Sequence, residues 1–124
     1  RGRRAVLHGL SRASGPRSAA ELHGDMRRRV PLSSLYRSLA VLEEAGVLVA
    51  HTGSRGVTRF ELAEWLAGHH HHLVCRDCGM VSDIHLDPEK EAGLQRLAAE
   101  AADNAGFAAS AHSLEIEGRC TRCR

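Results

Sequence analysis

Apolar residues in the first third of the chain recur at the spacing of amphipathic helices. Leu35, Leu39 and Leu42 stand at positions i, i+4 and i+7, which predicts the buried stripe of one helix. Upstream, residues 18–21 have the sequence Ser-Ala-Ala-Glu and therefore the spacing of a capping box, which predicts the start of another helix running toward residue 29. Two short helices joined by a tight connection indicate a helix-turn-helix.

Alternating apolar and polar residues replace the helical spacing after this point. Residues 47–51 and 57–62 predict two strands around a turn at 53–56, and such a hairpin after a helix-turn-helix makes a winged helix. Small polar groups, a Tyr and an Arg at the start of the second helix suit the major groove of DNA. The predicted DNA-binding residues are Ser33, Ser34, Tyr36, Arg37 and, at the hairpin tip, Arg55. A small helical domain that binds no nucleic acid is the alternative.

The second half predicts a small α+β unit. Strands at 69–74, 80–84 and 112–117 accompany one long helix, from Asp87-Pro88 to about Asn104, with Leu94, Leu97 and Ala101 facing inward. Because the outer strand of this unit has an unpaired edge, we expect edge-to-edge dimerisation. The predicted fold class is α+β, with an N-terminal winged helix-turn-helix domain (1–62), a hinge (63–68) and a small C-terminal α/β dimerisation domain with a four-cysteine zinc site (69–124).

Charge separates the two halves further. Residues 1–60 hold 11 Arg against 4 acidic residues, a balance of +7, and residues 61–124 hold 6 basic against 11 acidic residues, a balance of −5. This asymmetry favours a polyanion as partner of the first half. The chain starts without an apolar signal segment and lacks an apolar run of roughly 18 residues, so we expect a cytoplasmic protein with no membrane partner.

The four cysteines form two Cys-x-x-Cys pairs. In a reducing compartment this pattern indicates zinc ligation. Four thiolates close a tetrahedral site with no open position, so the predicted role of this zinc is structural. A redox dithiol is the alternative. The predicted ligands are Cys75, Cys78, Cys120 and Cys123.

Four consecutive histidines precede the first cysteine pair. On a strand, alternate side chains point to opposite faces, so His70 and His72 share one face and His69 and His71 share the other. We predict a sensor site that joins the two domains, with ligands Glu61, His70, His72 and His51. We predict a second site with ligands His69, His71, His112 and an acidic residue of the long helix, Glu91 or Glu89. Mixed nitrogen and oxygen donors suit Zn²⁺, Fe²⁺, Ni²⁺ or Mn²⁺.

These motifs, taken in order, resemble the ferric-uptake-regulator (Fur) superfamily over nearly the whole chain. The resemblance implies a homodimeric winged-helix repressor that binds AT-rich palindromic operators, with a four-cysteine zinc site and an interdomain sensor site. Tyr36 and Arg37 match the Tyr-Arg of the family's recognition helix. The segments that carry the resemblance are 32–39, 59–62, 69–79, Gly106-Phe107 through His112, and the terminal Cys-x-x-Cys.

Two departures from the family pattern bear on the sensor metal. Zinc-sensing members often place a Cys shortly before the His run, where this chain has Ala63 to Ala67, and iron-sensing members often take a His from the loop that here reads Gly15-Pro16-Arg17. The 18–29 helix and the unbroken His run look more like zinc-uptake regulators, whereas Glu61 looks more like iron regulators. Zinc is the favoured sensor ion.

The prediction from sequence is therefore a metal-responsive repressor that binds double-stranded operator DNA as a homodimer and takes no small organic substrate. An iron-responsive or peroxide-sensing regulator is the nearest alternative. A metal-buffering protein without control of DNA is an alternative of another class. An enzyme is not expected, since the four-cysteine site has no open position and the chain lacks a His-Glu-x-x-His pattern.

Overall fold

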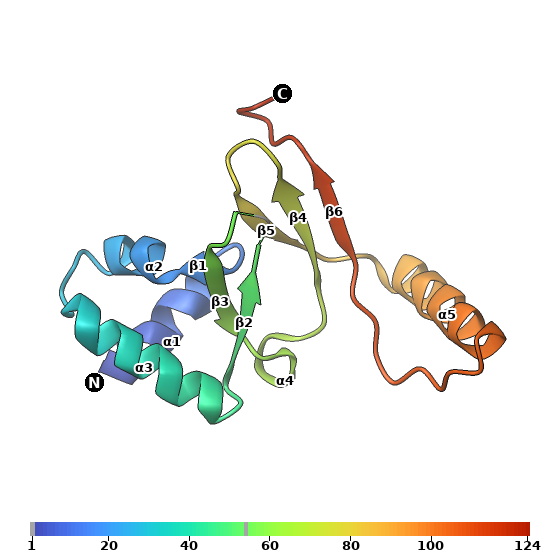
Figure 1. The fold of residues 1–124 in the computed structure, drawn as a ribbon, viewed down its shortest axis with the longest axis horizontal. Coiled ribbons are helices and arrows are strands. Elements are labelled where there is room, and N and C mark those ends of the chain that lie inside the picture. The colour runs from blue at the N-terminus through green and yellow to red at the C-terminus, as the bar shows by residue number, and fades with distance from the viewer. Residues whose placement is uncertain (1, 54) are drawn as a thin grey trace.

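The computed structural model describes residues 2–53 and 55–124. It contains two three-stranded sheets with strand orders β1-β3-β2 and β5-β4-β6. Three helices gather beside the first sheet, and the longest helix projects away beyond the second (Figure 1). The fold is α+β, as predicted. In chain order the elements are α1 (Gly2–Arg12), β1 (Arg17–Ser18), α2 (Ala19–Asp25), α3 (Leu32–Glu44), β2 (Leu48–Thr52), β3 (Thr58–Leu62), α4 (Glu64–Ala67), β4 (His71–Cys75), β5 (Val81–Ile84), α5 (Pro88–Asn104) and β6 (Glu115–Gly118).

The core lies between α1, α2, α3 and the first sheet. The predicted stripe of Leu35, Leu39 and Leu42 is buried there, together with Val6 and Leu10 of α1. A fully buried Leu or Val side chain contributes about 1.5–3 kcal/mol relative to an exposed one. Apolar packing therefore fixes the position of α3, the predicted recognition helix, against α1.

Helix α2 begins as predicted and ends earlier than predicted. The Ser18 hydroxyl accepts the amide of Glu21, and the Glu21 carboxylate accepts the amide of Ser18, which completes the capping box. The helix stops at Asp25 because Arg27 and Arg28 adopt left-handed backbone conformations, with φ of 57° and 56°. This turn separates α2 from α3.

The hairpin of β2 and β3 is the wing, with antiparallel pairing from Leu48↔Leu62 to Thr52↔Thr58. The two-residue strand β1 pairs with β3 and was not predicted. The predicted turn at 53–56 includes Ser54, which lies outside the described residues. The segment predicted as a hinge contains the short helix α4.

In the second sheet β4 is central, antiparallel to β5 and parallel to β6. The long helix α5 has Asp87 as its N-cap, as predicted, but it has no buried residue, and Leu97 is 63% exposed. The prediction that Leu94, Leu97 and Ala101 face a core of the same chain was therefore wrong, because α5 extends away from the sheet (Figure 1). Among the described residues, no helix is both long and apolar enough to cross a bilayer.

Candidate metal centres and nucleic-acid interface

The four cysteines come together where the loop after β4 meets the C-terminal segment after β6. The Sγ atoms of Cys75, Cys78, Cys120 and Cys123 lie within 4.8 Å of one another. The Sγ atoms of Cys78 and Cys120 are 3.8 Å apart, which is about the edge of a tetrahedron with Zn–S bonds of about 2.3 Å. This donor set fits a closed zinc site.

Backbone amides prepare one of these thiols for ionisation. The amides of Cys78 and Cys120 point at Cys75 Sγ, at 3.5 and 3.4 Å, and lower the pKa of Cys75 to about 6. Cys120 in turn raises the pKa of Cys123 to about 12, since a second thiolate beside the first is unfavourable. A divalent cation would remove that repulsion.

A second cluster joins the wing to the second sheet. Glu61 of β3 lies beside His72 of β4, Asp83 of β5 and His70, which comes just before β4. The ligand atoms of all four residues lie within 4.8 Å of one another. Glu61 Oε1 is 2.6 Å from His70 Nε2 and 3.2 Å from His72 Nε2. We call this set, Glu61, His70, His72 and Asp83, the sensor cluster.

The carboxylates of the sensor cluster favour a bound cation. Burial alone would raise the pKa of Glu61, but hydrogen bonds from His51, His70 and His72 outweigh it and lower that pKa to about 2. Burial raises the pKa of Asp83. Asp83 Oδ1 is buried without a hydrogen-bond partner among the described residues, 3.4 Å from His70 Nε2 and 3.6 Å from His72 Nε2. An unpaired buried acceptor costs about 1–3 kcal/mol, which a cation would relieve.

His51, predicted as a sensor ligand, lies at the margin of the sensor cluster. Its Nε2 is 2.5 Å from Glu61 Oε2, the oxygen on the other side of the carboxylate from His70. This contact raises the pKa of His51. Its role as a ligand stays a prediction, and the structure adds Asp83 as a fourth donor that the sequence analysis did not name.

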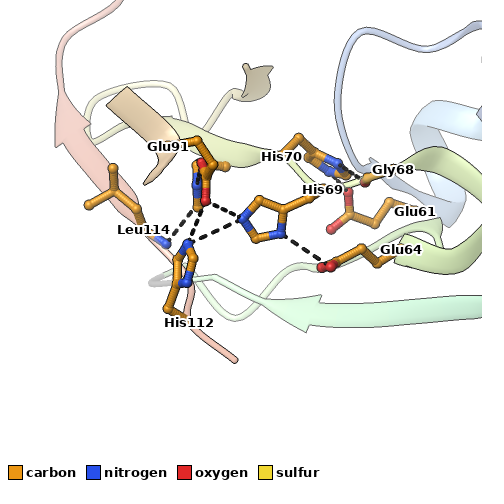
Figure 2. A network of polar contacts seen from close by, with 9 residues as sticks. Glu61, Glu64, Gly68, His69, His70, Glu91, His112 and Leu114 are labelled. Atoms are coloured by element: carbon orange, nitrogen blue, oxygen red, sulfur yellow. Dashed lines mark hydrogen bonds and ion pairs between the residues drawn. The ribbon is translucent and has the colours of Figure 1, made fainter. Parts of the chain in front are cut away.

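The other face of the His run forms the second cluster, His69, His71, Glu91 and His112, with ligand atoms within 4.8 Å of one another. Glu91 of α5 is its centre: Oε1 is 2.8 Å from His71 Nε2, and Oε2 is 2.7 Å from His112 Nε2 and 2.9 Å from His69 Nε2. Figure 2 shows His69 between these groups and Glu64, with His70 turned away toward Glu61. Of the two predicted acidic residues, Glu91 belongs to the cluster and Glu89 does not, and metal binding by Glu91 stays a prediction.

The remaining ring nitrogens orient the histidines. His70 Nδ1 lies 3.1 Å from the Gly68 carbonyl and His69 Nδ1 lies 3.2 Å from the Glu64 carboxylate (Figure 2). Both oxygens are acceptors, so each Nδ1 donates its proton to them. Each Nε2 then faces a carboxylate of its cluster, Glu61 for His70 and Glu91 for His69, where it could bind a cation, the usual arrangement of metal-binding histidines. His71 differs, since its Nδ1 accepts the amide of Leu114 at 3.2 Å. Sequence reasoning did not find Glu64 as a partner of the second cluster.

The predicted DNA-binding residues of α3 lie at the surface. Tyr36 is 55% exposed, and Arg37 donates to the Ser34 hydroxyl at 3.2 Å, so two of these side chains already contact each other. Ser33 is also exposed. Arg55 instead donates to the carbonyl of Asp77 in the loop between the first two cysteines. Contact of these five residues with DNA stays a prediction.

The fold and its clusters define a class of winged-helix proteins whose second sheet carries cysteine, histidine and carboxylate donors. The comparisons with known proteins identify the family within that class. The sequence model of the ferric uptake regulator family matches residues 1–117. The chain belongs to the ferric uptake regulator family.

Three relatives illustrate the range of similarity. The ferric uptake regulation protein of Cupriavidus metallidurans is 39% identical over 93 residues, which are 75% of this chain and 60% of that protein. The zinc uptake regulation protein of Mycobacterium tuberculosis is 38% identical over 112 residues, 87% of this chain and 80% of that protein. The crystal structure of the Vibrio cholerae ferric uptake regulator has a TM-score of 0.74 at 28% identity, covering 96% of this chain and 88% of that one.

Proposed function

We propose that this chain is a metal-responsive repressor whose dimer binds palindromic operator DNA when the sensor cluster holds its metal ion. The observation that carries the proposal is the position of Glu61. It lies on β3 of the wing, whereas His70, His72 and Asp83 belong to the second sheet or the segment leading into it. An ion held by all four would fix the winged helix relative to that sheet. DNA binding then depends on the ion, because the paired recognition helices need a defined separation.

The protein residues supply the orientation and the ion supplies the positive charge. The Gly68 carbonyl holds the His70 ring so that Nε2 faces Glu61. Without an ion, protonated histidine can occupy part of this role, since Glu61 raises the pKa of His70 against the lowering effect of burial. An ion bound at His70 Nε2 would take the place of that proton.

Zinc is the proposed sensor ion, supported by the similarity to the zinc uptake regulation protein of M. tuberculosis. One observation favours a second candidate, Fe²⁺. The sensor cluster has two carboxylates and no thiolate, and oxygen donors suit harder ions than zinc. In an iron form the same cluster is a candidate for peroxide sensing, which would be detected as oxidised histidine by mass spectrometry. Ni²⁺ and Mn²⁺ remain to be compared in the same titration.

We propose a division of roles along the chain. Residues 1–62 bind DNA, 63–68 form the hinge, and 69–124 bind metal and a second copy of the chain. The apolar residues Leu97, Phe107 and Ile116 are exposed on α5, on the segment after it and on β6, where a second copy would cover them. The four-cysteine site holds a structural zinc. No catalytic role is proposed.

Metal titration tests this function directly. Metal-stripped protein would be titrated with Zn²⁺, Fe²⁺, Ni²⁺ and Mn²⁺ while anisotropy follows its affinity for a duplex selected from random-sequence DNA by zinc-loaded protein. Sedimentation would follow dimerisation in the same samples. We expect affinity to rise at least about tenfold with the physiological ion, a coupling of about 1.4 kcal/mol. Tight metal binding with no change in DNA affinity would instead indicate a metal-buffering protein.

A further inference from the structure

The loop between α1 and β1 lies against the edge of the second sheet. Strand β5 is an outer strand in the order β5-β4-β6, so one side of its backbone is free to bond outside the sheet. The amide of Asp83 donates to the carbonyl of Ser14 at 2.8 Å. A segment of the winged helix thus occupies the free edge of β5.

Gly15 allows this close approach. It is buried, and a Cβ at this position would lie 2.4 Å from the Val81 carbonyl oxygen and 2.7 Å from Ser82 Cα. Both are backbone atoms of the β5 strand, so they cannot swing aside as a flexible side chain would. The φ of Gly15 is not in the left-handed region. Space, and not backbone conformation, therefore requires glycine here.

Asp83 faces two ways at this contact. Its amide bonds to the loop, while its buried Oδ1 lies in the sensor cluster, 3.4 Å from His70 Nε2. One residue therefore belongs both to the proposed metal site and to the docking contact. The loop continues back into α1, whose Val6 and Leu10 share a core with Leu35 of α3.

We propose that Ser14 and Gly15 form the docking seat through which the sensor cluster positions the recognition helix. The inference rests on the proposed function of the sensor cluster. An ion held by Asp83 and Glu61 fixes β5 beside the wing, and the seat then holds the end of α1 at the same strand. α1 carries that position to α3 through the buried core. Gly15 is a positioning residue, since it has no side chain to bind the ion and acts through its close approach to the backbone of β5.

Hydrogen exchange at the amide of residue 83 tests the seat without DNA. In wild type we expect Zn²⁺ to slow this exchange by at least about tenfold, because the ion holds the amide against Ser14. Gly15→Ala should lose that protection while its zinc stoichiometry stays unchanged. Gly24→Ala is the matched control, since a Cβ at Gly24 of α2 meets no atom within 4 Å. It should behave as wild type.

DNA affinity supplies the second readout. Gly15→Ala should reduce the zinc-dependent affinity for the selected duplex by about tenfold or more, and Gly24→Ala should not. If wild type lacks zinc-dependent DNA binding, the proposed function fails, and the exchange measurement still decides on the seat. Equal zinc protection in wild type and Gly15→Ala, or none in wild type, would overturn the seat.

A second variant covers the case in which Gly15→Ala does not fold. Asp83→Asn keeps the amide at position 83 and removes the charge that would face the ion. We expect zinc to leave the exchange of this amide unchanged in Asp83→Asn while it slows exchange in wild type. Full zinc protection in Asp83→Asn would overturn the coupling between the cluster and the seat.

Discussion

Trp65 donates its indole N–H to the carbonyl of Gly46 at 2.9 Å. Gly46 follows the end of α3 and adopts a φ of +78°, and Trp65 lies in α4, between the two sheets. The bond therefore ties the segment that links the sheets to the end of the predicted recognition helix, although Trp65 is 71% exposed.

Trp65→Phe keeps an aromatic ring and removes only the donor. We expect a loss of about 0.5–1 kcal/mol in the free energy of unfolding, since the bond is exposed to solvent. Zinc-dependent DNA affinity should fall by a few fold at most. Urea unfolding followed by circular dichroism measures the first effect. A loss of several kcal/mol would mean that the ring packs more tightly than its exposure indicates.

The pH dependence of stability should have opposite signs with and without metal. In the metal-free protein, the lowered pKa of Glu61 contributes stability that is present above its ordinary pKa of 4.5 and is lost as pH falls toward about 2. The raised pKa values of His51 and His70 contribute stability that is present below 6.5 and is lost as pH rises through the folded values. The sensor cluster is thus most stable without metal between about pH 4.5 and 6.5.

As pH falls toward 6.5, the metal-loaded protein should lose stability, whereas the metal-free protein gains it. As pH falls, protons compete with the ion for His70, whose pKa is raised by Glu61 against the lowering effect of burial, so the ion is released. Thermal unfolding at several pH values, with Zn²⁺ and with a chelator, compares the two forms. Parallel pH profiles for both forms would show that the histidines do not bind the ion.

Removal of the proposed structural zinc should destabilise the second sheet more than the winged helix. β6 is exposed along its length, and Cys120 and Cys123 beyond it meet Cys75 and Cys78. Cys120→Ser should lose zinc and several kcal/mol of stability, since structural zinc contributes on the order of 10 kcal/mol of binding free energy in small domains. Zinc analysis and thermal unfolding measure both effects. Thr121→Ala, in the same loop but without a ligand atom, is the control.

The two histidine faces should separate in function. His70→Ala should lower sensor affinity and the metal response of DNA binding by at least about 10–100-fold, because it removes a proposed ligand and loss of even a residue that orients a ligand costs that much. His69→Ala should affect the second cluster and leave most of that response. His8→Ala, in α1 and outside both clusters, serves as control. Equal losses in His69→Ala and His70→Ala would argue against two separate sites.

Arg37 tests the nucleic-acid interface. It lies at the surface of α3 and bonds only to Ser34 among the described residues, so Arg37→Ala should leave the thermal midpoint nearly unchanged. We expect DNA affinity to fall by about 1–3 kcal/mol if Arg37 reads a base, with loss of discrimination at one position. Competition with altered duplexes distinguishes a base contact from a phosphate contact, which would weaken binding to all sequences equally.

Strand alternation was enough to predict that His69 and His71 separate from His70 and His72. It did not predict Asp83, because that donor enters through the pairing His72↔Asp83 across the sheet. The cysteine loop joins β4 to β5, and the pair Val74↔Val81 that closes this loop fixes the register. Counting two residues back along β4 and two forward along β5 from this pair gives His72↔Asp83. The signal was present, but it was long-range and not a local period.

The choice between Glu89 and Glu91 shows a different limit. Both residues begin α5, and the sequence fixes neither the rotation of this helix nor its distance from β4. The structure brings Glu91 to His71 and His112. The apolar spacing of Leu94 and Leu97 predicted the helix correctly and its partner wrongly. Periodicity identifies an apolar face, but it cannot say whether the same chain or another covers that face.

Strand β4 and the two residues before it carry donors of all three clusters. The cysteines therefore fix the register of this strand. A slip of one residue would exchange the two faces of a strand, and along four identical histidines it would still present histidine to both sides. The donors themselves would not reveal such an error. Cys75, fixed within the four-cysteine cluster, sets which histidines reach Glu61 and which reach Glu91. The four-cysteine cluster therefore determines which histidines belong to the proposed sensor site.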